Sequence, residues 1–241
     1  MISKIQILET FVPEPKRPSA FQNAFTDHID PTQGWLTESE AFLLWSLSGA
    51  VNSEFAIVEI GSYLGRSTVS LALGSKGAKV HAVDPHTGDV SEVEQGLSID
   101  TYEGFLANIE KAGANDQVRP MRMKSVEAAE IYDGPEIGLL FIDGWHSEEA
   151  VEEDVRSWLP HLAPQCTLVF DDWERPDVAQ GIKNIRSLVP ALVGSIGKDL
   201  VFTNSDAATA LPILRYAAKH ERIRYTLARM RLAQDVRADF R

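Results

Sequence analysis

Three aspartates follow two apolar stretches and could together bind a metal ion. Asp143 follows the run Gly138 to Ile142, and Asp171 and Asp172 follow the run Thr167 to Phe170. If the two runs are neighbouring parallel strands, they lie about 5 Å apart, and the carboxylates meet at the carboxyl edge of the sheet. Such carboxylates raise one another's pKa unless a cation neutralises them. Oxygen ligands suit Mg²⁺, with Mn²⁺ or Ca²⁺ as alternatives, and helix caps without a metal are the other interpretation.

His146 stands three residues after Asp143, in a short turn before a helix that begins near Ser147. From this turn an imidazole can reach a hydroxyl at the metal without being a ligand itself. Because a neutral imidazole accepts a proton, we expect His146 to act as a general base. The alternative is a histidine at a helix start that has no catalytic role.

Two glycines join the apolar strand 55–60 to the helix-like stretch 68–73. Glycine allows a tight turn and lets a ligand approach the backbone closely, as in the first turn of nucleotide-binding units. The spacing Gly61-x-x-x-Gly65 differs from the Gly-x-Gly-x-x-Gly that holds a pyrophosphate. The sequence therefore disfavours a dinucleotide, and a tight turn without a ligand is the alternative.

Asp84 ends the next apolar run and lies 23 residues after Gly61. Rossmann-like folds place a carboxylate near this separation to accept hydrogen bonds from ribose hydroxyls. We therefore expect Asp84 at a ribose, and a cap of the following turn is the alternative.

The stretch Val58 to Thr68 resembles the glycine loop of class I S-adenosylmethionine-dependent methyltransferases. Glu59 is the acid common there two residues before the first glycine, and Tyr63 and Ser67 match residues that catechol-type O-methyltransferases carry near the methionine end of the cofactor. Ser125 and Trp145 match positions beside the adenine, although Ser125 also fits a plain helix N-cap. The resemblance implies a cofactor site that contains Glu59, Gly61, Tyr63, Gly65, Ser67, Asp84, Ser125, Asp143 and Trp145.

The spacing from Asp143 to Asp171 and Asp172 is similar to that of the metal ligands in the catechol-type family, which often has Asn in place of Asp172. Bacterial relatives that tailor sugars and antibiotics carry a histidine where His146 stands. The resemblance thus implies a metal-assisted O-methyltransferase acting on a hydroxyl of a sugar, antibiotic or phenol. The alternatives are an NAD(P)-dependent oxidoreductase and a non-catalytic S-adenosylmethionine-binding module on the same fold.

These residues need a sheet whose strands end along one edge. We expect an α/β fold with a Rossmann-like, seven-stranded, mostly parallel sheet and helices on both faces. The resemblance implies one antiparallel strand, within the runs 192–196 and 200–203. The pattern Thr37-x-x-Glu40 predicts a capping box where a helix begins.

The 241 residues suffice for one such domain with appendages. We predict an N-terminal arm over 1–34, a methyltransferase domain over 35–205 and a basic helical extension over 206–241. The extension has seven Arg and one Lys against four acids. A solvated terminal helix is the first interpretation, and self-association between this extension and the acidic body of a second copy is the alternative.

The net charge of −12 argues against a nucleic-acid partner. A single cysteine, Cys166, excludes an internal disulfide and fits a buried strand. We find neither a signal peptide nor a membrane-spanning run and expect a cytoplasmic protein without a membrane partner. The long acidic connection 85–100 predicts a lid or binding loop.

Overall fold

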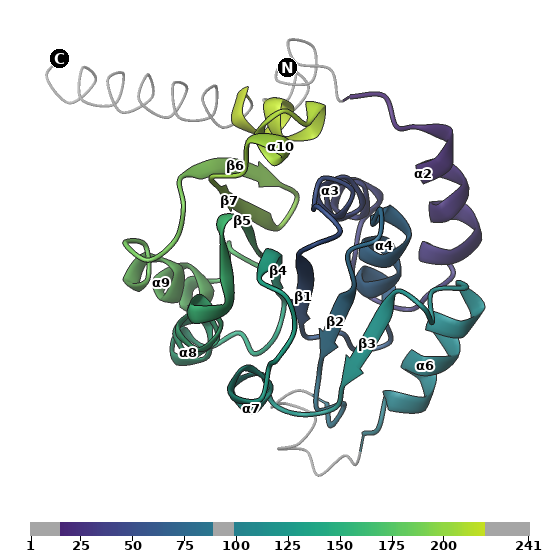
Figure 1. Cartoon of the computed structure of the whole chain (residues 1–241), viewed down its shortest axis with the longest axis horizontal. Helices are drawn as coiled ribbons and strands as arrows, with labels where there is room; N and C mark the ends of the chain where they lie inside the picture. The colour runs from purple at the N-terminus through teal and green to yellow at the C-terminus, as the bar shows by residue number, and fades with distance from the viewer. Residues whose placement is uncertain (1–14, 89–98, 220–241) are drawn as a thin grey trace, which may run out of the picture.

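A seven-stranded sheet organises the computed structural model, which describes residues 15–88 and 99–219 (Figure 1). The strand order is β3-β2-β1-β4-β5-β7-β6, and β7 is antiparallel to both of its neighbours while β1 to β5 are parallel. The predicted mostly parallel sheet with one antiparallel strand is therefore confirmed. The strands are β1 Ala56–Ile60, β2 Val80–Val83, β3 Val118–Met121, β4 Ile137–Ile142, β5 Leu162–Phe170, β6 Leu192–Ile196 and β7 Asp199–Thr203.

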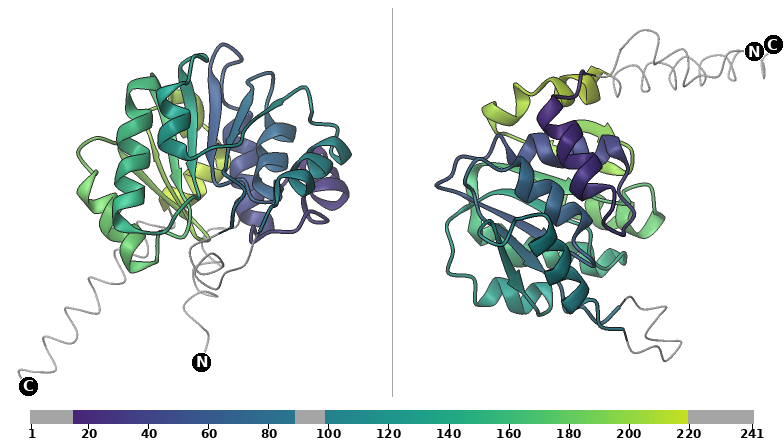
Figure 2. Two further views of the ribbon diagram at one scale, coloured as in Figure 1. Left: turned by 90° about the horizontal axis from the view of Figure 1, so that it is seen from below. Right: turned by 90° about the vertical axis from the view of Figure 1, so that its right-hand side faces the viewer.

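Helices cover both faces of the sheet (Figure 2). One face carries α2 Ser19–Ala24, the π-helix η1 Phe25–Ile29, α3 Glu38–Ser48, α4 Arg66–Gly74, α6 Tyr102–Lys111 and α10 Asp206–Thr209. The other face carries α7 Ser125–Glu130, α8 Glu148–Trp158 and α9 Pro176–Asn184, and the 3₁₀ turn η2 Leu159–His161 follows α8.

Alternate residues of the central strands enter two separate cores. Leu139 and Phe141 of β4 pack with α3 and α4, whereas Leu140 and Ile142 pack with α8 and α9. Successive strand side chains point to opposite faces, so a strand covered on both sides must be apolar at every position. This explains why the apolar runs in the sequence are continuous rather than alternating.

The strand register brings four strand ends into line. Ile60 of β1 pairs with Val83 of β2 and with Ile142 of β4, and Ile142 pairs with Phe170 of β5. Parallel strands end at a common edge, where ligands of open α/β folds bind. The residues that come next in each strand therefore lie along that edge: Gly61, Asp84, Asp143 and Asp171.

The capping box predicted at the start of α3 is present. Thr37 Oγ1 accepts a hydrogen bond from the Glu40 N–H at 3.4 Å, and Glu40 Oε2 accepts one from the Thr37 N–H at 2.8 Å. Glu40 is almost fully buried. Its second carboxylate oxygen, Oε1, accepts a hydrogen bond from the Lys198 N–H.

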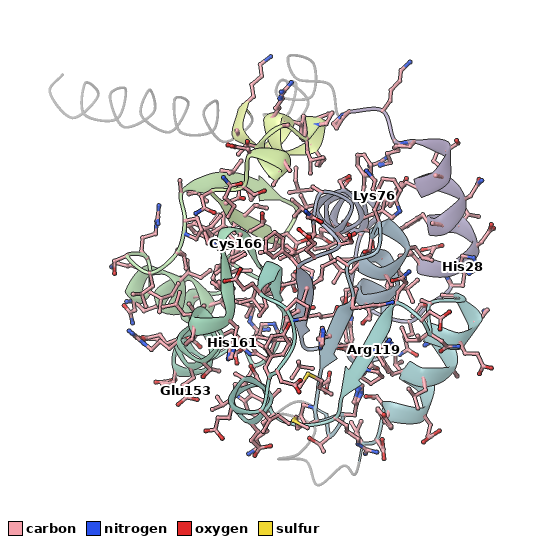
Figure 3. All side chains as sticks on the ribbon, viewed as in Figure 1. His28, Lys76, Arg119, Glu153, His161 and Cys166 are labelled. Atoms are coloured by element: carbon pink, nitrogen blue, oxygen red, sulfur yellow. The ribbon has the colours of Figure 1, made fainter. Side chains whose placement is uncertain are left out.

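The described part of the N-terminal arm packs on the domain. Phe21 and Ile29 are fully buried in the core beneath α3 and α4. Residues 1–14, 89–98 and 220–241 lie outside the described residues, so the lid in 85–100 and self-association through 206–241 stay predictions. Cys166 is buried in β5 (Figure 3). No helix within 15–88 and 99–219 is long and apolar enough to cross a membrane.

Candidate functional site

The turn after β1 needs glycine at both predicted positions. Gly61 has φ +88°, and a Cβ there would lie 2.0 Å from the carbonyl oxygen of Asp143. Gly65 has φ +90° and is the N-cap of α4. Left-handed backbone favours glycine, and the contact with Asp143 leaves no room for a side chain. The turn is thereby fixed directly against the end of β4.

The Asp84 side chain holds this turn by accepting hydrogen bonds from the backbone of the turn. One carboxylate oxygen accepts hydrogen bonds from the N–H groups of Ser62 at 2.9 Å and Tyr63 at 2.7 Å, and the other accepts from His86 N–H at 2.6 Å. The bond from His86 is the predicted cap of the following turn, whereas the bonds from Ser62 and Tyr63, which were not predicted, hold the glycine turn. A carboxylate has about four acceptor positions, so lone pairs remain, and the ribose contact stays a prediction.

Glu59 lies beneath the turn rather than on its surface. Its side chain is fully buried and accepts a hydrogen bond from Thr68 Oγ1 in the first turn of α4. Burial raises the pKa of Glu59 to about 7, and hydrogen bonds from Ser67 and Thr68 act against that rise. Glu59 therefore joins β1 to α4 from below, and its predicted part in cofactor binding would act through the turn.

Tyr63 forms one wall of the turn together with an exposed tryptophan. The Tyr63 backbone has φ +47°, and its ring centroid lies 5.4 Å from that of Trp35 at an interplanar angle of 33°. Trp35 is 77% exposed. Arg66, the first residue of α4, connects the same segment by hydrogen bonds to the carbonyl oxygens of Asp30 and Thr32. The chain before α3 thus borders the predicted cofactor site.

The two residues predicted beside the adenine have different surroundings. Ser125 Oγ accepts a hydrogen bond from Trp158 Nε1 at 3.0 Å. The alternative of Ser125 as an N-cap is wrong, because Lys124 is the N-cap of α7 and Ser125 is its first residue. Trp145 is 48% exposed at the carboxyl edge, so its ring is available to a ligand.

Two of the three predicted metal ligands, Asp143 and Asp171, come together, and a lysine lies between Asp171 and the third, Asp172. Lys198, in the β6–β7 turn, forms a salt bridge with Asp171 Oδ2, and its Nζ lies 3.5 Å from Asp172 Oδ1. Asp172 has φ +49°, a left-handed conformation that aspartate tolerates, and it also lies 3.5 Å from Arg175. The protein therefore supplies a cation of its own to the cluster.

Burial dominates the electrostatics of this cluster. It raises the pKa of Asp143 to about 7, and burial together with the Asp143 carboxylate raises the pKa of Asp171 to about 8. Asp199 is fully buried, and burial and the neighbouring Asp171 raise its pKa well above its ordinary value. Burial opposes the charge of Lys198, yet Asp143 and Asp171 raise its pKa above the ordinary value. The single positive charge of Lys198 does not neutralise the carboxyl groups of Asp143, Asp171 and Asp199 together.

His146 faces the same carboxylates. Its Nε2 lies 3.4 Å from Asp172 Oδ2 and 3.7 Å from Asp143 Oδ1. Burial, followed by the charge of Arg175, lowers the pKa of His146 below its ordinary value. The imidazole is therefore neutral near pH 7, as a proton acceptor must be.

The residues of this edge fit a cation. One donor atom each from Asp143, His146 and Asp171 lies within 4.8 Å of the other two. Asp171 Oδ1 and His146 Nε2 are buried and accept no hydrogen bond within the described residues. Buried polar atoms without partners are costly, and a cation would satisfy both at once. The predicted ligands were Asp143, Asp171 and Asp172, so this donor set has His146, predicted as a base, in the place of Asp172.

Sequence reasoning did not find Lys198, Asp199 or Glu40 at this site. Lys198 and Asp199 follow Gly197 in a hairpin turn, where a lysine usually means a solvated loop. Only the pairing of β7 with β5 brings this turn to Asp171. The sequence alone, without the tertiary contacts, does not indicate that Lys198 lies at this site.

Comparison with known proteins finds a family match over this part of the chain. Residues 58–173 match the family model described as a methyltransferase domain. This stretch begins in β1 and ends at Trp173, so it contains the glycine turn, Asp84 and the acidic cluster.

Solved structures share the fold at low sequence identity. The O-methyltransferase NovP has a TM-score of 0.61 and 12% identity over 82% of this chain and 94% of NovP. TomG, an O-methyltransferase from Streptomyces achromogenes involved in tomaymycin synthesis and solved with S-adenosylmethionine, has a TM-score of 0.54 and 16% identity over 83% of this chain and 94% of TomG.

A curated relative of uncharacterized function is y4gI from Sinorhizobium fredii (strain NBRC 101917 / NGR234). It is 26% identical over 220 residues, which cover 85% of this chain. This chain spans only 23% of the length of y4gI.

Proposed function

We propose that this chain, whose residues 58–173 match the methyltransferase domain model, is an S-adenosylmethionine-dependent O-methyltransferase that acts on a hydroxyl of a small molecule. One observation carries the proposal. The turn at Gly61 lies directly against Asp143, so the predicted methyl-donor site and the cluster around His146 adjoin at one sheet edge. A donor site beside a proton acceptor is what methyl transfer to a hydroxyl requires.

S-adenosylmethionine, when bound, supplies the methyl group from its sulfonium. The chain would position it with Tyr63 and the glycine turn, with the remaining acceptor capacity of Asp84 at the ribose, and with the exposed ring of Trp145 at the adenine. Glu59, Ser67 and Ser125 would support these contacts from below, because their side chains already bind neighbouring helices or rings. This arrangement leaves the carboxyl edge beyond Asp143 open to the acceptor.

Asp143, Asp171 and Asp172 would hold a divalent cation, with Mg²⁺ or Mn²⁺ the proposed ions, and His146 would stay unligated beside them. Such a cation lowers the pKa of a hydroxyl near it. The unpartnered Asp171 Oδ1 supports its presence. If the cation is required, chelation by EDTA should stop turnover, and Mg²⁺ or Mn²⁺ should restore it.

His146 would accept the proton of the acceptor hydroxyl at Nε2, an atom without a hydrogen-bond partner in the described structure. Asp172 and Asp143, at 3.4 and 3.7 Å, would stabilise the imidazolium that forms. The acceptor we propose is a sugar, an antibiotic or a phenol, and TomG, which shares the fold, is described as involved in tomaymycin synthesis.

The test is binding followed by product mass. Thermal unfolding of the full chain should shift upward with S-adenosylhomocysteine and stay unchanged with NAD, since ligands stabilise only the state that binds them. Incubation with S-adenosylmethionine and a panel of hydroxylated small molecules should yield a product heavier by one methylene. A shift with NAD alone would favour the oxidoreductase, and binding without any methylated product would favour the non-catalytic module.

A further inference from the structure

Lys198 places its ammonium group on the carboxylates that are expected to hold a divalent cation. It pairs with Asp171 Oδ2 and lies 3.5 Å from Asp172 Oδ1. The Asp171 side chain is 1% exposed, so water contributes little to neutralising it, whereas the Lys198 side chain is 28% exposed. The ammonium is thus the counter-charge of a nearly buried carboxylate and has its own access to solvent.

The backbone that carries Lys198 is held in place by two hydrogen bonds and lies close against Glu40. The Lys198 N–H donates to Glu40 Oε1 at 2.9 Å, and the Lys198 carbonyl accepts from the Trp173 N–H at 3.3 Å. Gly197 has φ +56°, and a Cβ there would lie 2.1 Å from Glu40 Oε1. Because the turn is pinned to α3, only the flexible stem of the lysine can move the ammonium toward or away from Asp171.

Part of the cluster still lacks a partner while Lys198 is in place. Asp171 Oδ1 and His146 Nε2 are buried and without hydrogen bonds in the described structure, and both belong to residues of the donor set Asp143, His146 and Asp171. A divalent ion there would share the Asp171 carboxylate with the ammonium. Two cations on one carboxylate in a poorly hydrated site repel each other strongly.

We propose that the Lys198 ammonium and a divalent cation compete for Asp171 and Asp172, so that the metal binds only when Lys198 swings out toward solvent. This rests on the proposed function in so far as that function includes a metal. Lys198 is then a built-in substitute cation that keeps the carboxylates paired in the metal-free protein and lowers the affinity for metal.

The experiment measures metal binding directly, on the full chain without cofactor or acceptor. Mn²⁺ binding is followed by electron paramagnetic resonance and by calorimetry for the wild type, Lys198→Met and Lys198→Gln. Both variants keep a long side chain and remove its charge. We expect each to bind Mn²⁺ at least about tenfold more tightly than the wild type. Mn²⁺ should also raise the unfolding temperature of each variant more than that of the wild type.

Two controls separate competition from a general change in charge. Lys183→Met removes an exposed lysine from α9 and should leave Mn²⁺ affinity unchanged. Lys198→Arg keeps a positive charge at the site and should bind no more tightly than the wild type. A folded Lys198→Met or Lys198→Gln protein whose Mn²⁺ affinity equals that of the wild type would overturn the proposal.

A variant that folds only with Mn²⁺ present would support it, because the ion then replaces the missing ammonium. If Lys198→Met fails to fold in either condition, Lys198→Gln decides, since its amide can still donate to Asp171. Methyl transfer is assayed separately, so loss of the proposed function and loss of competition give different results.

Discussion

Glu40 and Lys198 lie 158 residues apart in the chain and are joined by a hydrogen bond of 2.9 Å from the Lys198 N–H to Glu40 Oε1. The same carboxylate closes the capping box of α3 through Oε2. One buried side chain thereby fixes both the start of a helix and the turn that presents Lys198 to Asp171. Glu40 therefore fixes the backbone from which the Lys198 side chain reaches Asp171.

Glu40→Ala should destabilise the protein by about 2–4 kcal/mol, because it removes a cap and a charge-assisted hydrogen bond from a buried position. Glu38→Ala is the matched control in the same helical turn. Glu38 is 45% exposed and pairs with Arg17, so its loss should cost less than about 1 kcal/mol. Urea unfolding of both variants checks this, and similar losses would show that the contact with Lys198 adds nothing.

Gly61→Ala should disrupt the turn because its Cβ would lie 2.0 Å from the Asp143 carbonyl oxygen. We expect a loss of more than about 3 kcal/mol in stability, together with weaker binding of S-adenosylhomocysteine. Gly113→Ala is the control, since Gly113 has φ +67° but no atom within 4 Å of a Cβ. It should show only the left-handed strain of about 1–2 kcal/mol. Equal losses in the two variants would remove the steric argument.

Glu59 should make stability fall as pH rises. Its folded pKa of about 7 lies above the ordinary 4.5, so the folded protein keeps a proton that the unfolded chain releases between these values. From about pH 4 to pH 8, Glu59→Gln should therefore gain about 3 kcal/mol relative to the wild type. Unfolding free energies at both pH values test this, with the exposed Glu110→Gln as a control for the loss of one acidic side chain. A constant difference for Glu59→Gln would mean that the pKa of Glu59 is the same in the folded and the unfolded protein.

Asp84→Ala should weaken binding of S-adenosylhomocysteine by about 1.5–3 kcal/mol for each charge-assisted hydrogen bond lost. The exposed Asp133→Ala should have no such effect. A cofactor analogue without ribose hydroxyls separates the two roles of Asp84 in calorimetry. If Asp84 contacts the ribose, the loss shrinks with the analogue, whereas a residue that only holds the Ser62 and Tyr63 amides gives the same loss for both ligands.

His146→Ala should lower kcat by about 10²–10⁴-fold, because a positioned general base contributes that much. The affinity for S-adenosylmethionine should be largely kept, since His146 faces the carboxylates rather than the glycine turn. His28→Ala, in the π-helix η1, is the control and should retain wild-type kcat. Steady-state kinetics at a constant S-adenosylmethionine concentration measures kcat for both variants. An unchanged kcat in His146→Ala would show that His146 is a residue at a helix start without a catalytic role.

The sequence by itself determined the elements whose signals are local. Continuous apolar runs predicted β1, β4 and β5, because strands buried on both faces need apolar residues throughout. The Thr37 capping box and the glycines after β1 are also local, since caps and left-handed turns depend on the residues within a few positions. Parallel pairing of these strands then required Asp143 and Asp171 to meet at one edge.

Tertiary structure alone decided what those aspartates face. Lys198 reaches Asp171 through the antiparallel pairing of β7 with β5 and through Glu40 on α3, and neither contact has a pattern within the sequence. The same holds for Asp84, whose carboxylate binds the amides of a turn that precedes it by more than 20 residues. Side-chain charge and hydrogen bonding depend on which groups become neighbours after folding and on how far water is excluded from them, and residue order does not specify either.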